Sequence, residues 1–161
     1  GLAQALEAHL SALPLAQDPG AKAIGVKISG CPNSCGQHHI ADIGFYGSSR
    51  KVGEREVPHY VLLLGGRTRE GEARFGQVVG RIPARRVPEA VERILKRYLE
   101  ERQNGESFQA YLDRVGAASF KPLLQDLQEV PPYEEAPEFY QDLGAEGEAF
   151  SVQLGRGECA V

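Results

Sequence analysis

Hydrophobic residues recur along the chain at two kinds of spacing, which predict both helices and strands. Helical spacing of three and four residues occurs in three stretches, 2–13, 88–103 and 107–115. Alternating or short continuous apolar runs, typical of strands, occur in four others, 23–28, 40–47, 59–66 and 77–82. Because the two kinds of element do not alternate strictly, their order predicts an α+β fold around a mixed or antiparallel sheet.

The strand-like runs predict different degrees of burial and different backbone contacts. The run 59–66 is almost continuously apolar before its two closing glycines, which predicts a strand buried on both faces. The run 40–47 contains two glycines, which indicate a backbone that bends or comes close to another group. The run 23–28 alternates apolar residues with small or charged ones, as a half-buried strand does.

The segments between these elements carry weaker signals. Residues 48–58 are polar and predict a loop or a short hairpin, and residues 67–76 predict a charged connection. Leucines at 123–127 predict one or two helical turns, and the acidic, proline-interrupted stretch 130–138 predicts no regular structure. A last alternating run at 149–154 predicts an edge strand.

Composition indicates a globular domain with an appended segment. The 161 residues are 42% hydrophobic and 25% charged, enough for one core, which we place in 1–118, with 119–161 as an extension that wraps it. The net charge of −4 argues against a nucleic-acid binder. No apolar run reaches the roughly 20 residues that span a membrane, and no signal-peptide pattern is present, so we expect no membrane partner and a cytoplasmic location.

Two of the three cysteines, Cys31 and Cys35, lie four positions apart in a turn rich in Gly, Pro and Asn. Three cysteines do not make a disulfide framework, and a clustered pair in a reducing compartment favours metal binding or redox chemistry. A turn of this kind directs several N–H groups inward beside the sulfurs, which suits thiolate-ligated iron or a bound anion. The sequence therefore predicts half of a metal site.

Other interpretations of the pair stay open at this point. The two thiols could be small buried side chains that lie close together by chance of packing. A zinc site would need a second pair of ligands, which only His38, His39 and Cys159 could supply, at poor spacing. A site completed by another subunit is a further possibility.

The residues around the pair resemble a known family. The run 30–37, Gly-Cys-Pro-Asn-Ser-Cys-Gly-Gln, continued by 41–47, resembles the second cysteine motif of the sirohaem-dependent nitrite and sulfite reductases. The resemblance covers about 23–118 and extends to the C-terminal part of that family through 60–66, 88–103, 104–108 and 114–116. It implies an α+β domain with its helices on one side of the sheet, of which 1–118 is the C-terminal part.

The resemblance also implies two cofactors and their ligands. In that family four cysteines hold a [4Fe–4S] cluster, and Cys31 matches the third of them. Cys35 matches the fourth, whose thiolate also bridges to the sirohaem iron. Asn33 and Gly36 match positions that line the cluster, where amide donors to the sulfurs would raise its reduction potential. The family's substrate-binding Arg and Lys residues lie in parts that cannot be mapped onto this sequence.

The activity implied is a six-electron reduction, of nitrite to ammonia or of sulfite to sulfide, with ferredoxin or a flavoprotein as the electron donor. The family's first two cluster cysteines are absent here and would precede Gly1. The sequence has no Met, and no capping residue precedes the helix that begins at Leu2. We therefore expect a chain cut from a longer protein, one that alone neither holds an intact cluster nor turns over substrate.

Several other residues invite a functional interpretation. His38 and His39 would point to opposite faces of a strand, so we assign them a structural or surface role. The basic residues that could meet sirohaem carboxylates or an acidic electron donor are Arg50, Lys51, Arg81, Arg85 and Arg86, although most charged residues are simply solvated. Cys159 is interpreted as an isolated thiol in a tail.

Two hypotheses from other classes remain beside the reductase. In one, the chain is a small metal-binding or electron-transfer module that completes its site by dimerising through Cys31 and Cys35. In the other, it is a non-catalytic interaction domain in which the motif has no remaining chemical role.

Overall fold

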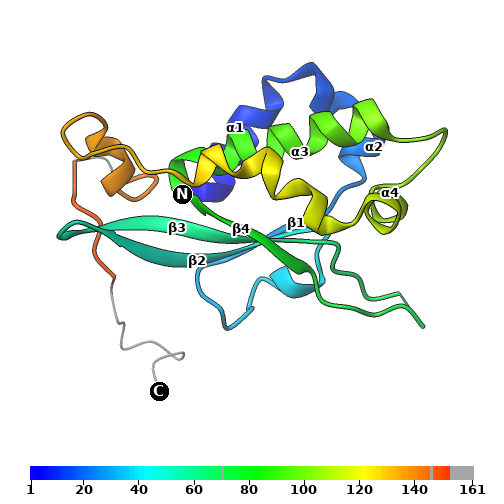
Figure 1. The fold of residues 1–161 in the computed structure, drawn as a ribbon, viewed down its shortest axis with the longest axis horizontal. Coiled ribbons are helices and arrows are strands. Elements are labelled where there is room, and N and C mark those ends of the chain that lie inside the picture. The colour runs from blue at the N-terminus through cyan, green and yellow to red at the C-terminus, as the bar shows by residue number, and fades with distance from the viewer. Residues whose placement is uncertain (70, 146, 153–161) are drawn as a thin grey trace.

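The computed structural model describes residues 1–69, 71–145 and 147–152, and its centre is a four-stranded sheet (Figure 1). The strands lie in the order β1-β2-β3-β4, with β1 parallel to β2 and the other neighbours antiparallel. Their bounds are Val26–Ser29 for β1, Ile43–Val52 for β2, Arg55–Leu64 for β3 and Gln77–Pro83 for β4. The predicted α+β fold with a mixed sheet is confirmed.

Helices cover one face of this sheet, as the resemblance implied (Figure 1). They are α1 (Leu2–Ser11), α2 (Pro19–Lys22), α3 (Val87–Glu101) and α4 (Phe108–Val115). Short 3-10 helices link them, at Pro14–Gln17, His38–Ile40 (η2), Ala84–Arg86, Ala117–Phe120, Pro122–Leu124, Asp126–Gln128 and Pro137–Tyr140. No helix in the described ranges is long and apolar enough to cross a membrane.

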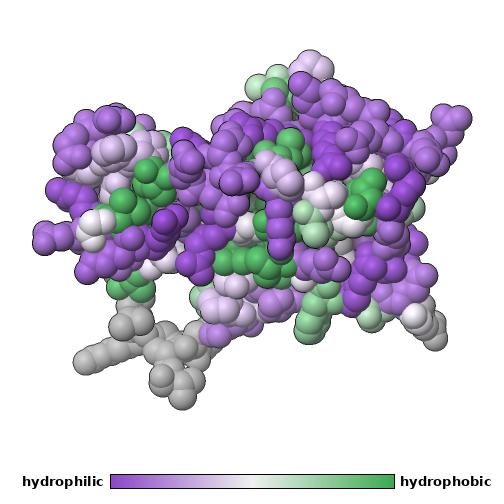
Figure 2. All heavy atoms as spheres, viewed as in Figure 1, coloured by the Kyte–Doolittle hydropathy of each residue, from purple (hydrophilic) through white to green (hydrophobic). Residues whose placement is uncertain are grey.

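The hydrophobic core lies between the helices and the sheet. Ile43 and Phe45 of β2 and Leu62 of β3 are fully buried against the apolar stripe of α3, which includes Val91 and Ile94. The stripe follows from apolar residues at spacings of three and four, which place them on one side of a helix. In Figure 2 the surface is mostly hydrophilic, and hydrophobic residues show where the helix layer meets the sheet.

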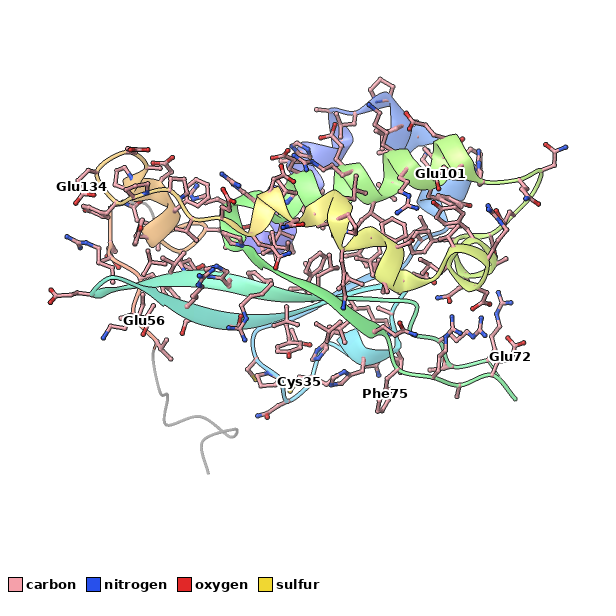
Figure 3. All side chains as sticks on the ribbon, in the orientation of Figure 1. Cys35, Glu56, Glu72, Phe75, Glu101 and Glu134 are labelled. Carbon is pink, nitrogen blue, oxygen red and sulfur yellow. The ribbon has the colours of Figure 1, made fainter. Side chains whose placement is uncertain are left out.

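The opposite face of the sheet carries alternate strand residues, and we call it the cysteine face. It is formed by Tyr46, Ser48 and Arg50 of β2 with His59 and Val61 of β3, which pair across the strands. In Figure 3 the labelled Cys35 lies below the sheet, on this side, with the helices above. Val61 and Leu62 are both buried, so the predicted two-sided burial of this strand is confirmed.

The structure decides one open alternative and differs from the predicted elements in two places. Residues 48–58 form the predicted hairpin rather than a loop, and it is long because β2 and β3 continue up to the turn at Gly53, where φ is +60°. Residues 38–40 form η2 rather than the start of a strand. Residues 149–152 form no strand, and the remainder of that run lies outside the described residues.

Residues that follow α4 complete the core. Phe120, Leu124 and Leu127 are fully buried among the same side chains as α3, although they lie on three separate 3-10 helices. Arg93 of α3 fixes this segment by donating hydrogen bonds to the Asp126 carboxylate, at 2.7 and 2.9 Å. The domain boundary at residue 118 stays a prediction.

Three glycines let the loop between β1 and β2 lie directly on neighbouring backbone. A Cβ at Gly44 would overlap the carbonyl of His38, and one at Gly66 would overlap the carbonyl of His39. A Cβ at Gly36 would overlap the carbonyl of Ile28. We call Gly36, Gly44 and Gly66 the glycine seat. The glycines of the 40–47 run therefore mark a close approach, as predicted.

Glu106 connects the end of α3 to α4. Its carboxylate accepts hydrogen bonds from Arg114 Nε at 2.9 Å and Nη2 at 2.7 Å, and from the Gln103 N–H at 3.1 Å. Its carbonyl accepts the Tyr98 hydroxyl at 2.8 Å. The contacts of the carboxylate with Arg114, the largest cause, and with the Gln103 N–H lower the pKa of Glu106 to about 2.

We expect Gly44→Ala to destabilise the protein by about 1–3 kcal/mol, the usual cost of overpacking a rigid site. The added Cβ has no room against the His38 carbonyl, which belongs to the backbone and cannot rotate away. Urea unfolding followed by circular dichroism measures the change. Gly30→Ala is the matched control, because a Cβ at Gly30 meets nothing within 4 Å. Equal stability of the two variants would contradict the close packing described.

We expect Glu106→Gln to reduce the loss of stability on acidification. The folded-state pKa of about 2 lies below the ordinary value of 4.5, so the ionised carboxylate stabilises the fold above pH 4.5. That contribution is lost as the pH falls from 4.5 towards 2. Urea midpoints measured between pH 6 and pH 3 should therefore fall less in Glu106→Gln than in the native protein. Glu100→Gln, an exposed position on α3, should fall as the native protein does.

Candidate metal centre

The candidate centre is the cysteine turn, residues 30–37, which joins the end of β1 to η2. Cys31 is half-buried and Cys35 is exposed, and both are free thiols. Asn33, which the resemblance placed beside the cluster, is exposed. The turn thus presents Cys35 on the cysteine face, where a group brought from outside can reach it (Figure 3).

The backbone of the turn has an unusual conformation at two residues that are not glycine. Ser34 and Gln37 have φ values of +62° and +58°, and the Gln37 N–H donates a 2.7 Å hydrogen bond to the Ser34 carbonyl. Positive φ is uncommon outside glycine and is found most often at functional sites. The surrounding contacts therefore hold the turn in a conformation that its own residues would not favour.

Ser29, at the end of β1, forms two hydrogen bonds that hold the cysteine turn. Its Oγ accepts the Gly36 N–H at 3.1 Å and shares a 2.8 Å hydrogen bond with His38 Nδ1. Ser29 and His38 are both buried. The Gly36 N–H is thus already bonded within the protein, and the roles of Asn33 and Gly36 towards a cluster stay predictions.

His38 and His39 lie differently from what the sequence suggested. They are on η2, not on a strand, so the argument that they face opposite ways is wrong, and their ring centroids are 4.1 Å apart. Burial, followed by the charge of His39, lowers the pKa of His38, so its ring is neutral at pH 7. Its Nε2 is buried with no partner among the described residues.

An aromatic cluster extends from the turn to the surface. The His38 ring lies 4.8 Å from that of Tyr46, and the His39 ring lies 5.2 Å from that of Phe75. Phe75 is 71% exposed, and the Gly76 N–H beside it donates a 2.7 Å hydrogen bond to the His39 carbonyl. The 67–76 connection therefore supports η2 and presents an exposed aromatic ring on the same side of the sheet as Cys35 (Figure 3).

The basic candidates separate into two groups. Arg85 Nε donates to the Glu138 carbonyl at 3.1 Å and Arg86 Nη1 to the Asp126 carbonyl at 2.8 Å, so both fix the C-terminal part of the chain. Arg50 and Arg81 lie on the cysteine face. Cys159 lies outside the described residues.

The described residues hold no group of three or more His, Cys, Asp or Glu side chains arranged to bind a metal ion. Cys31 and Cys35 are free cysteines in this part of the chain, and their role as metal ligands stays a prediction. Sequence reasoning proposed this pair from its turn chemistry. It missed Ser29 and the buried state of His38, because no local pattern marks a contact between residues nine positions apart.

Comparison with known proteins places relatives of this chain among the sulfite reductases. The sulfite reductase [ferredoxin] 1 of Mycolicibacterium paratuberculosis is 33% identical over 95 residues, which are 57% of this chain and 17% of the relative. The sulfite reductase [NADPH] hemoprotein beta-component of Dickeya chrysanthemi is 31% identical over 101 residues, 63% of this chain and 16% of the relative. The chain thus spans about a sixth of the length of these curated relatives.

A solved structure has the same fold. The Mycobacterium tuberculosis NirA protein matches with a TM-score of 0.59 and 30% identity, over 71% of this chain and 21% of that one. Residues 3–130 match the family described as the nitrite and sulphite reductase 4Fe-4S domain. This match contains the whole sheet, the cysteine turn and the buried turns after α4. The chain therefore belongs to the nitrite and sulphite reductase 4Fe-4S domain family.

Proposed function

We propose that this chain supplies one half of a [4Fe–4S] site coupled to sirohaem in a cytoplasmic nitrite or sulfite reductase. The single observation that carries the proposal is the cysteine turn itself. It carries two free thiols in a loop that the glycine seat lets lie directly on neighbouring backbone. The chain that contains it matches the family over 3–130. In the parent enzyme, the proposed reaction is the six-electron reduction of nitrite to ammonia or of sulfite to sulfide.

The donor set fits this group. Thiolate sulfur is the ligand that iron–sulfur clusters use, and Cys31 and Cys35 provide two of the four that such a cluster needs. The N–H groups of Gly36 and Gln37 already bond to Ser29 Oγ and to the Ser34 carbonyl, so in this proposal the thiolates are the donors that the turn offers. When bound, the cluster supplies one-electron transfer and the sirohaem supplies the site where the oxyanion is reduced.

The residues of this chain contribute position and environment to that chemistry. Cys31 would hold iron from the half-buried side of the turn. Cys35 would hold it from the exposed side, which is also the side that the sirohaem would approach. Ser29 and the glycine seat keep the two sulfurs in one geometry, which is what the residues behind metal ligands generally do. Neutral His38 behind the turn adds no positive charge there.

The electron donor in this proposal is ferredoxin or a flavoprotein. The relatives compared above include one named for ferredoxin and one named for NADPH, so the names of proteins similar to this chain include ferredoxin and a second reductant. The exposed Phe75 and Cys35 lie on the same side of the sheet, which is the side from which electrons would enter or leave (Figure 3).

A second candidate function is a module that completes its site by dimerisation. The observation that favours it is the exposure of Cys35. Two chains brought together at their cysteine turns would supply four thiolates, the number that a cluster or a zinc ion takes. The two candidates differ in the oligomeric state of the iron-loaded chain.

Anaerobic incubation of the purified chain with ferrous iron and sulfide tests both candidates. With two thiolates per chain, we expect at most about two irons per chain. Cys35→Ser should abolish most of the iron uptake, and Cys159→Ser, the same substitution at the third cysteine, should not. Iron content, visible absorption and sedimentation velocity are the measurements.

The outcomes separate cleanly. Weak, substoichiometric iron in a monomer supports the half-site of a larger reductase. An iron-loaded dimer that dissociates on chelation supports the dimerising module. A monomer with four irons and four sulfides, or uptake that survives Cys35→Ser, would contradict the half-site. Iron–sulfur clusters are held by thiolates. The visible absorption spectrum of Cys35→Ser is therefore the decisive measurement, because the half-site requires its iron–sulfur bands to be lost.

A further inference from the structure

A lysine of β1 bonds directly to the cysteine turn. Lys27 is half-buried, and its Nζ donates a 2.7 Å hydrogen bond to Oε1 of the Gln37 side chain. Side chains alternate between the two faces of a strand, so Lys27 and Ser29 lie on the same face of β1. Ser29 bonds to Gly36 and Lys27 bonds to Gln37, the two residues that follow Cys35. The ammonium group is therefore held at the turn itself.

Gln37 holds the lysine from a backbone conformation that is unusual for its residue type. Its φ and ψ are +58° and +35°. Its N–H donates to the Ser34 carbonyl at 2.7 Å, and its carbonyl accepts the Ile40 N–H at 3.3 Å. Non-glycine residues keep a positive φ where surrounding contacts fix them, and such residues gather at functional sites. The Gln37 side chain therefore starts from a fixed position, from which it binds the ammonium group of Lys27.

No carboxylate among the described residues forms an ion pair with Lys27. The ion pairs there are formed by arginines and by His9. Asp42, which directly precedes β2, has its carboxylate bonded to a backbone N–H and to the Gln109 amide. Residues 29–41 contain no Asp or Glu. Lys27 thus brings to the turn a positive charge that no carboxylate of the described chain contacts.

The proposed occupants of the turn carry the opposite charge. The thiolate, not the thiol, is the form of cysteine that binds metals, so each ligand adds one negative charge. Two side chains outside the turn bond to it within the described residues, and of these Ser29 is neutral and Lys27 is charged. In this part of the chain, Lys27 is therefore placed to offset the charge of the thiolates.

We propose that Lys27, held by Gln37, makes the cysteine turn electropositive and so favours anionic over neutral species at Cys35. The inference deepens the proposed function and rests on it in one respect, that the anion of interest is a thiolate-bound cluster. A cation at this position stabilises the more negative, reduced state of such a cluster and raises its reduction potential, which depends on the net charge nearby.

Alkylation of the whole chain without iron tests this charge. Iodoacetate is anionic and iodoacetamide is neutral, and both react with the same thiolate of Cys35. The ratio of their rates therefore reports the charge near Cys35, whereas a change in exposure or in the amount of thiolate alters both rates together. Peptide fragmentation in the mass spectrometer separates the label on Cys35 from that on Cys31.

We expect Lys27→Gln to lower the iodoacetate-to-iodoacetamide ratio about two- to fourfold, the effect of one unit charge at roughly 10 Å in a watery environment. The Cα atoms of Cys35 and Gln37, two residues apart, lie within about 7.6 Å of each other, which is consistent with this distance. The measurement is made at about 0.01 M salt, where screening is weak, and repeated at about 1 M, where the difference should disappear.

Three further variants make the test specific to the charge of Lys27. Lys27→Met removes the charge but keeps the apolar stem, and it should lower the ratio as Lys27→Gln does. Lys27→Arg keeps the charge and should keep the native ratio. Lys96→Gln is the matched control, because Lys96 is exposed on α3 on the helix side of the sheet. It removes the same charge far from the turn and should leave the ratio unchanged.

The proposal is overturned if the ratio is unchanged in Lys27→Gln and Lys27→Met, if it falls equally in Lys96→Gln, or if the difference persists at high salt. Failure of the proposed function gives a different result. Iron uptake that requires Cys35, with an unchanged ratio in Lys27→Gln, would keep the half-site and remove the role of Lys27. A lowered ratio, with iron uptake that survives Cys35→Ser, would keep the role of Lys27 and contradict the half-site.

Discussion

The contact between the cysteine turn and the backbone beneath it is the constraint on which the candidate centre depends. The turn has few apolar side chains to bury, so burial cannot hold it. Instead Gly36, Gly44 and Gly66 allow backbone to lie against backbone, and Ser29 Oγ bonds to two groups of the loop. The positions of the thiols therefore follow from the β1–β2–β3 ladder, the most regular part of the molecule. A ligand pair held in this way keeps one geometry, which a metal centre requires.

The two faces of the sheet differ in how their polar groups are paired. On the helix face, apolar side chains fill the core and the neighbouring arginines have acidic partners. On the cysteine face, Ser48 Oγ and the Nε2 atoms of His38 and His59 are buried without partners in the described chain. Each such atom costs roughly 1–3 kcal/mol. Two further atoms of this kind, Arg85 Nη2 and Gln109 Oε1, belong to the helical layer, so the cysteine side holds three of the five in the described chain. Proteins leave buried polar atoms without hydrogen-bond partners mainly at functional sites.

Elements with a strong apolar period could be predicted closely from the sequence, and elements without one only approximately. The helix α3 has an apolar residue at every third or fourth position, so its prediction was right almost to the residue. The hairpin extension of β2 and β3 is mostly polar between Ser48 and Glu56, so the sequence left a loop and a short hairpin as alternatives. The leucines at 123–127 predicted one or two helical turns, which are present as short 3-10 helices, whereas the burial of Phe120 on a separate turn follows no period.

The candidate centre was predictable for a different reason. Its two proposed ligands lie within one turn, so Cys31 and Cys35 could be recognised together from spacing and turn residues alone. The supporting residues come from distant positions: His38 is nine residues from Ser29, and Gly66, a whole hairpin further along, lies against the backbone of His39 in η2, which follows the turn. A close approach through a glycine is visible in the sequence only as a small residue in a strand. The chemistry of this centre is therefore local in sequence, whereas the geometry that makes it usable is a property of the fold.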